Sequence, residues 1–199
     1  KIILRLIPLK KNLNSKTINQ NGLTGCLNLI DLNFENIIIE VENANCEDAI
    51  NIIRSEGHIK KVKSLMSTND GLDMDFSNII IDDLIITDAG NDCVDLSFGN
   101  YQITNSELNY CGDKGFSVGE KSKLFSNLMF VRDSNIGIAA KDSSIAEFEN
   151  AYFENVNICL AAYKKKQEFN GGTIKVKKMK CLNYDKVKDI DIFSKATHN

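Results

Sequence analysis

A 22-residue repeat runs through the middle of this chain and constrains its fold more than any local motif. The units 47–68, 69–90, 91–112, 113–134 and 135–156 align without a gap. Every residue in the third column is small: Ala49, Gly71, Cys93, Gly115, Gly137 and, one unit later, Cys159. The fourth column is apolar throughout: Ile50, Leu72, Val94, Phe116, Ile138 and Leu160. A fixed period with columns of like residues predicts a solenoid in which successive repeats stack on one another.

The pattern within each unit selects the type of solenoid. Apolar and polar residues alternate over short runs such as 72–76 and 94–98, and this period of two predicts strands with one buried face. Asn, Asp, Gly and Ser link the runs, as expected of tight turns. Leucine-rich and helical repeats are excluded by their asparagine plateau and their greater length. We therefore predict an all-β fold, a right-handed parallel β-helix, because parallel crossovers are right-handed.

Composition favours a single domain. The chain has 199 residues, of which 43% are hydrophobic, and Pro8 is its only proline, so no Pro-rich linker divides it. We expect one parallel β-helix domain over 1–199, with an N-terminal cap segment at 1–23, coils over 24–184, about seven in number, and a C-terminal cap or tail at 185–199. Because the sequence does not begin with Met, we expect it to be a mature or excised piece of a longer protein.

The repeat weakens towards both ends. Residues 24–45 read as an earlier coil of slightly different length, in which Leu27 and Leu29 match the apolar columns. Residues 1–23 are expected to supply one more strand through Ile2, Leu4 and Leu6, with a polar loop at 10–20. The first coils are atypical, as is usual at the ends of solenoids.

Charge and hydropathy exclude two classes of partner. The formal net charge is −3, so nucleic acid is a disfavoured ligand, and the lysine-rich segments 164–166 and 175–180 are interpreted as solvated loops. No apolar run approaches the roughly 18 residues that a membrane-spanning helix needs. The predicted partners are therefore a polysaccharide or a neighbouring domain of a longer chain.

The six cysteines are interpreted as structural. Cys93 and Cys159 occupy the small interior column and Cys26 joins them, where a thiol packs as a small apolar group. The other cysteines show no CxxC or Cys/His spacing, so a zinc site is not predicted. The same spacing gives no indication of a disulfide framework.

The first column of the repeat is polar. It contains Glu47, Asn69, Asn91, Asp113, Asn135 and Asn157. Aligned amides at the turn of each coil can bond to one another along the stack, so we predict an asparagine ladder. Asn also tolerates the tight turn conformations between strands. A catalytic role for Asn91 or Asn69 is the alternative.

The second column carries the strongest candidate site. It begins with Asp48, Asp70 and Asp92 and changes to Lys114, while Asp73 and Asp95 form an outward column beside it. Carboxylates stacked at the spacing of coils repel one another and raise one another's pKa unless something neutralises them. Ca2+ at Asp70 and Asp92, the Lys114 side chain, backbone N–H groups and partial protonation are four ways to do so. The strip is either a solvated acidic face or a pair of catalytic acids and bases.

Three successive segments carry a resemblance to a known family. Residues 68–71, 90–93 and 112–119 look like degenerate versions of motifs in the polygalacturonase family of glycoside hydrolases, which are right-handed parallel β-helices. The resemblance matches Asp70 and Asp92 to family aspartates. It places Lys114 or Asp113 where the family has a histidine.

The resemblance also shows where this chain departs from the family. Asn91 stands at the position of the proton-donating aspartate, and an amide cannot protonate a leaving glycosidic oxygen. No Arg-x-Lys follows, and Lys141 is the nearest basic residue. More broadly, the chain is similar to bacterial right-handed β-helix repeat proteins of the pectate-lyase-like superfamily, in phrases such as 46–49 and 112–115. That group includes lyases, epimerases and modules without known activity.

Two functional hypotheses follow from this reading. The first is a non-catalytic β-helix module of a larger bacterial protein, extracellular or at the cell surface, with a rigid face for polysaccharide or for another domain. The second is a lyase, hydrolase or epimerase that acts on acidic polysaccharide. In both, the site residues are Asp70, Asp73, Asp92, Asp95, Asp113, Lys114 and Lys141. Of these, Asp70, Asp92, Asp95 and Lys114 would be catalytic, and Asp73, Asp113 and Lys141 would bind the ligand.

Overall fold

The computed structural model describes residues 2–7 and 22–198, and every regular element in these residues is a β-strand. The strands are, in chain order, β1 (Ile3–Leu6), β2 (Gly25–Ile30), β3 (Asn33–Ala44), β4 (Asp48–Ile53), β5 (Glu56–Ser67), β6 (Leu72–Asp75), β7 (Asn78–Ala89), β8 (Val94–Ser97), β9 (Asn100–Val118), β10 (Lys123–Lys141), β11 (Ile145–Tyr163), β12 (Thr173–Leu182), β13 (Lys186–Ile190) and β14 (Lys195–His198). Nothing in this part of the chain is a helix that could cross a membrane.

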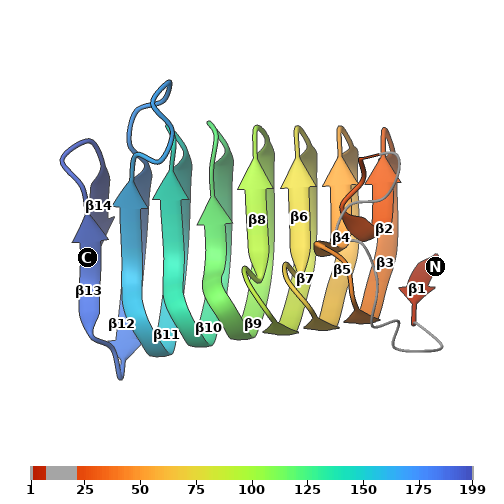
Figure 1. Ribbon diagram of the computed structural model, residues 1–199, viewed down its shortest axis with the longest axis horizontal. Helices are drawn as coiled ribbons and strands as arrows, with labels where there is room; N and C mark the ends of the chain where they lie inside the picture. The colour runs from red at the N-terminus through yellow and green to blue at the C-terminus, as the bar shows by residue number, and fades with distance from the viewer. Residues whose placement is uncertain (1, 8–21, 199) are drawn as a thin grey trace.

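The strands stack side by side in parallel as a β-solenoid of about 8 turns, with roughly 22 residues per coil (Figure 1). The main path of pairing runs β1-β3-β5-β7-β9-β10-β11-β12-β14, and a second path runs β2-β4-β6-β8-β9. The prediction of an all-β parallel β-helix with this period is confirmed.

The 22-residue register of the sequence is the strand register at the fourth column, whereas residues 100–111 of β9 pair with 123–134 of β10, 23 positions on, before a register shift between Ser134 and Ile136. Leu72 pairs with Val94, Val94 with Phe116 and Phe116 with Ile138. All four side chains are fully buried, so the fourth column of the repeat is a continuous interior stack. Each coil adds one apolar residue at the same position in the core, so the apolar column continues from coil to coil without interruption.

Two outward faces matter for function. The polar face is the outward side of β4, β6 and β8, of residues 114–118, 136–141 and 158–163, and of the turns that border them. The groove face is the outward side of residues 78–80, 100–102, 123–125 and 145–147, where β7, β9, β10 and β11 begin. At the corner between the two faces the backbone has positive φ in five successive coils, at Arg54, Phe76, Phe98, Glu120 and Asp142.

Parallel strand pairing continues to both ends of the solenoid. β1 pairs with β3, and Leu4 and Leu6 pack against the core as predicted. The predicted polar loop at 10–20 lies outside the described residues. At the other end β13 pairs with β11, so Lys188 stands next to Leu160 in the strand register, is exposed, and its Nζ donates to the Ala196 carbonyl at 3.0 Å. The apolar column thus ends beside a charged side chain.

The six cysteines form three disulfides, Cys26–Cys46, Cys93–Cys111 and Cys159–Cys181. The prediction that Cys93 and Cys159 are buried is confirmed, but the interpretation of the cysteines as free thiols without a disulfide framework is wrong. The partners are 20, 18 and 22 residues apart, close to one coil, so it is the winding of the chain that brings them together. Local spacing motifs could not reveal such pairs.

Enlarging the small column is expected to destabilise the fold. A Cβ on Gly115 would lie 2.7 Å from Cγ1 of Val131 and 2.6 Å from the Gly137 carbonyl oxygen. Gly115→Leu should therefore overpack the core and lower the free energy of unfolding by about 2 kcal/mol. Urea unfolding tests this, with Lys60→Leu on the exposed side of β5 as the control. Equal denaturation midpoints for Gly115→Leu and the parent would show that this column has room.

Candidate functional site

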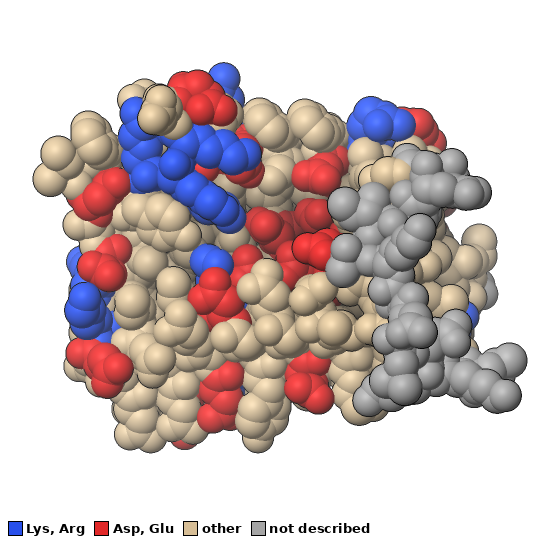
Figure 2. Space-filling model, viewed as in Figure 1, with Lys and Arg blue, Asp and Glu red and all other residues tan. Residues whose placement is uncertain are grey.

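The seven predicted site residues all lie on the polar face, in four consecutive coils. Figure 2 shows acidic side chains gathered near the middle of this face, with basic side chains beside them. Asp73 pairs with Asp95 in the strand register, so these carboxylates stack directly on neighbouring coils. The strand pairing therefore places these two carboxylates in one outward column.

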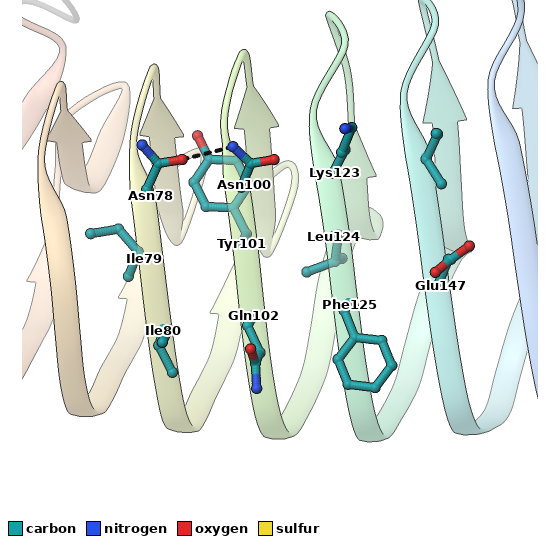
Figure 3. Close-up of a pocket in the computed structure, with 11 residues that line it drawn as sticks. Asn78, Ile79, Ile80, Asn100, Tyr101, Gln102, Lys123, Leu124, Phe125 and Glu147 are labelled. Carbon is teal, nitrogen blue, oxygen red and sulfur yellow. Dashed lines mark hydrogen bonds between the residues drawn. The ribbon is translucent and has the colours of Figure 1, made fainter.

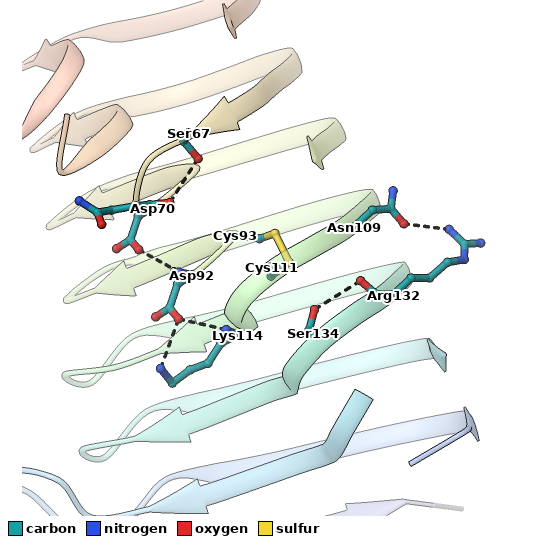
Figure 4. The surroundings of a disulfide bond; sticks show 10 residues. Ser67, Asp70, Asp92, Cys93, Asn109, Cys111, Lys114, Arg132 and Ser134 are labelled. Atoms are coloured by element: carbon teal, nitrogen blue, oxygen red, sulfur yellow. Dashed lines mark hydrogen bonds and ion pairs between the residues drawn. A yellow bond between two sulfur atoms is a disulfide. The ribbon is translucent and has the colours of Figure 1, made fainter. Parts of the chain in front are cut away.

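Asp70 and Asp92 tie one coil to the next (Figure 4). One oxygen of Asp70, Oδ1, accepts the Asp92 backbone N–H at 2.9 Å and the Asn91 side-chain amide at 2.8 Å. The Asp92 Oδ1 in turn accepts the Lys114 backbone N–H at 3.1 Å and the Lys114 ammonium at 3.2 Å. These two carboxylates hold the turns that carry the site, and Asn91 is engaged by Asp70.

Two lysines reach into the acidic strip from the C-terminal side. Lys114 forms ion pairs with Asp92 and Asp113. Lys141 lies one coil further on, and its Nζ is 3.8 Å from Oδ1 of Asp95. Its side chain passes over Gly119, where an added Cβ would be only 2.9 Å from the Lys141 Cε. Glycine at that position therefore leaves the path of the lysine open.

At the centre of the site, neither the Lys141 ammonium nor the Ser117 hydroxyl forms a hydrogen bond with another described residue. Lys141 is only 5% exposed, yet the 3.8 Å distance to Asp95 is too long for a hydrogen bond. Ser117 follows Asp95 in the same outward column, is fully buried, and its hydroxyl has no partner among the described residues. Buried donors of this kind are costly when left unpaired. Asp95, with 29% of its side chain exposed, is the accessible acceptor beside them.

An inserted loop adds residues that the sequence reading missed. Ile145 pairs with Thr173, 28 positions later, so this coil is longer than the others, and the extra residues form a loop. The Asp142 carboxylate accepts the backbone N–H groups of Lys165 and Lys166 at 2.8 Å each. The lysine-rich segment 164–166, which we interpreted as a solvated loop, is therefore anchored to the polar face. The same interpretation is wrong for segment 175–180, which lies within β12 and pairs with β11. In the sequence, the inserted loop is indicated by the greater length of this coil.

Glu120 connects this loop to the strip. It accepts the Ser97 hydroxyl at 2.7 Å, and its other oxygen is 2.6 Å from Nζ of Lys166. Burial alone would raise the pKa of Glu120, but the hydrogen bonds from Lys166 and Ser97 outweigh it and lower the pKa. Glu120 is therefore ionised at neutral pH and forms part of the same charged network.

The carboxyl groups on the N-terminal side of the strip have raised pKa values. Burial raises the pKa of Asp70 to about 7 and that of Asp75 to about 6. Burial and then the charges of Asp75 and Asp48 raise the pKa of Asp73 well above its usual value. Within the described ranges, no basic side chain forms an ion pair with Asp70, Asp73 or Asp75. Protonated and ionised carboxyls therefore coexist here near neutral pH.

The acidic strip is neutralised by Lys114, by backbone N–H groups and by protonation of carboxyl groups. Lys114 and backbone N–H groups do so at Asp92 and Asp70, and raised pKa values indicate partial protonation further along. Among residues 2–7 and 22–198, no three acidic, histidine or cysteine side chains are placed to hold a metal ion. Ca2+ at Asp70 and Asp92 stays a prediction.

The predicted asparagine ladder forms in the later coils. Asn135 donates to Asp113, and Asn157 donates to Asn135, each at 3.0 Å. A second ladder that the repeat columns did not reveal joins Asn155 to Asp133 at 2.9 Å. These amides stabilise the turns and leave the polar face free for the charged groups.

Comparison of the chain with protein-family models, curated proteins and solved structures finds no match.

Proposed function

We propose that this chain is a non-catalytic β-solenoid module of a larger bacterial protein and that its polar face binds a polysaccharide. The observation that supports this most strongly is the Lys141 ammonium beside Asp95, which lies 3.8 Å from the carboxylate and so forms an ion pair but no hydrogen bond with it. A sugar hydroxyl can accept a hydrogen bond from an ammonium group while donating one to a carboxylate. An ammonium group without a hydrogen bond, next to an accessible carboxylate, fits that ligand.

The rigidity of the face supports the same proposal. Asp70 and Asp92 fix successive turns, and the Cys93–Cys111 disulfide lies between the turns that carry Asp92 and Lys114 (Figure 4). Side chains held in this way lose little further conformational entropy when a ligand binds, which favours affinity. The bacterial origin rests on the sequence resemblance alone.

We also propose an extracellular or cell-surface location. The support is the set of three disulfides, because disulfides persist in oxidising compartments and are rare in the cytosol. Polysaccharides of cell walls and capsules are encountered in the same environment.

A polysaccharide-modifying enzyme is the second candidate. It is favoured by Asp70 and Asp75, whose pKa values of about 7 and about 6 suit proton transfer near neutral pH. Lys114 and Lys141 would then face the carboxylate of a uronate. In this hypothesis the chain is a lyase, hydrolase or epimerase acting on acidic polysaccharide.

A screen of neutral and uronate polysaccharides tests both candidates. Binding is measured by isothermal calorimetry, and unsaturated lyase products by their absorbance, with and without Ca2+. We expect binding without turnover, and we expect Lys141→Met or Asp95→Asn to weaken it about tenfold, because each removes a hydrogen bond that involves a charged group. Lys63→Met, on a different face of the solenoid, is the control for the loss of a lysine.

Three outcomes would decide against the proposal. If the parent binds no polysaccharide, the polar face is left as an interaction surface for another domain. If both polar-face variants bind as the parent does, the ligand lies elsewhere. If unsaturated products or reducing ends accumulate and Asp70→Asn abolishes them, the chain is an enzyme.

A further inference from the structure

A groove with a volume of about 540 Å³ lies on the groove face, away from the charged strip (Figure 3). It crosses the first residues of β7, β9, β10 and β11, so its floor spans four successive coils. Its size is in the range of small-ligand sites. None of the residues considered above for the polar face contributes to it.

The polar groups of the groove are mostly uncharged amides. Asn100 donates to Oδ1 of Asn78 at 2.7 Å, which leaves the Asn78 amide N–H groups and the Asn100 carbonyl oxygen without a partner in the described chain. The side chain of Gln102 makes no hydrogen bond there either, so both ends of its amide are free. The groove therefore offers donors and acceptors in similar number.

Apolar surface alternates with these amides along the solenoid axis. Ile80, Gln102 and Phe125 pair in the strand register on three successive coils. Ile80 is 43% exposed and Phe125 is 40% exposed, so both present apolar surface to the groove. An exposed aromatic ring beside free amides suits a ligand whose own surface has apolar and hydroxyl-bearing sides.

The charge of the groove and the spacing of its polar groups indicate which class of ligand it can bind. The charged residues that line the groove are Lys123 and Glu147, which have opposite signs, and Glu147 also pairs with Lys175 at 2.7 Å. The groove has no excess charge to attract an ionic polymer. Asn78 and Asn100 lie on neighbouring coils, about 4.8 Å apart, which is similar to the advance of one ring in an extended sugar chain.

We infer that this groove is a second binding site, one that takes an uncharged oligosaccharide lying along the solenoid axis. One sugar ring stacks on Phe125, and hydroxyls of the neighbouring rings bond to the free amide atoms of Asn78, Asn100 and Gln102. The inference does not rest on ligand binding at the polar face, because the two sites share no residue.

Titration with cellohexaose and xylohexaose, followed by isothermal calorimetry, tests this site. Phe125→Ala should weaken binding of the better ligand about tenfold, and Gln102→Ala should weaken it severalfold. Phe130→Ala is the matched control, because it removes the same ring from the same strand but on a different face. Thermal melts of all three variants confirm that they are folded.

The result that would overturn the inference is equally specific. The site is ruled out if neither hexasaccharide binds to the parent, or if Phe125→Ala binds as tightly as the parent. Hexagalacturonate competing for the same Phe125-dependent site at equal affinity would contradict the uncharged ligand class. Only binding that is lost in Phe125→Ala is assigned to the groove, and binding that is lost in Lys141→Met or Asp95→Asn is assigned to the polar face, so a failure at the polar face and a failure here are distinguishable.

Discussion

The double variant Cys93→Ala/Cys111→Ala is expected to unfold with a free energy about 3 kcal/mol lower than that of the parent. The disulfide closes a loop of 18 residues in sequence, so its loss returns conformational freedom to the unfolded chain. Both cysteines are buried in the native state, and alanine is small enough to replace each without a clash. Urea unfolding of the oxidised parent and of the variant measures the difference.

Reduction provides the control for this prediction. When the parent is unfolded and reduced with dithiothreitol before refolding in the presence of reductant, its midpoint should approach that of the double variant. Detection of free thiols in the unfolded, unreduced parent would contradict the three assigned pairs. Equal midpoints for oxidised parent and variant would show that the disulfide does not constrain the unfolded chain.

The stability of the protein is expected to fall as the pH rises from about 4 to about 7. Burial raises the folded-state pKa of Asp70 from 3.8 to about 7. Below pH 3.8 the Asp70 carboxyl is protonated in both the folded and the unfolded state, so its titration does not change the free energy of unfolding. Between the two values the unfolded chain releases this proton and the folded chain keeps it, so unfolding becomes more favourable. The expected loss for this residue is on the order of 3 kcal/mol.

Asp70→Asn isolates this effect. An amide can still accept the hydrogen bond from the Asp92 backbone but does not titrate, so the slope of stability against pH should flatten between pH 4 and 7. Asp83→Asn, at an exposed carboxylate on β7, is the matched control and should keep the slope of the parent. Urea midpoints collected at half-unit pH intervals test this. A parent whose midpoint rises over this range would contradict the sign.

The interior of the fold could be predicted because each of its columns has one physical requirement. Leu72, Val94, Phe116 and Ile138 must all be apolar, and Gly115 must be small because Val131 packs against it. Such requirements recur at every coil, so they appear as a period in the sequence. The disulfides lack this property, since each links two different positions of the coil and no later coil repeats the pair.

The polar face was predicted in part for the same reason. Asp92 and Lys114 are one repeat apart, so stacking alone places them together. Glu120 and Lys166 are not related by the repeat, because the loop before β12 breaks the period. The pairing of Lys141 with Asp95 spans two coils and depends on the path that Gly119 leaves open.

The groove could not be recognised from the sequence. Asn78, Asn100 and Gln102 look like ordinary turn and surface residues in a chain rich in Asn. Their significance comes from alignment on neighbouring strands beside Phe125, which requires the register of β7, β9 and β10. The ungapped 22-residue columns place Leu124 rather than Phe125 after Gln102, because β9 and β10 pair here with an offset of 23 residues.

A crystal structure of the protein soaked with the oligosaccharide that binds best in the screen is the most direct test of the polar face. The account predicts ligand density over β6 and β8, with a ligand oxygen within hydrogen-bond distance of both the Lys141 Nζ and the Asp95 carboxylate. An oligosaccharide bound only outside this face, with the Lys141 ammonium still without a hydrogen bond, would contradict it.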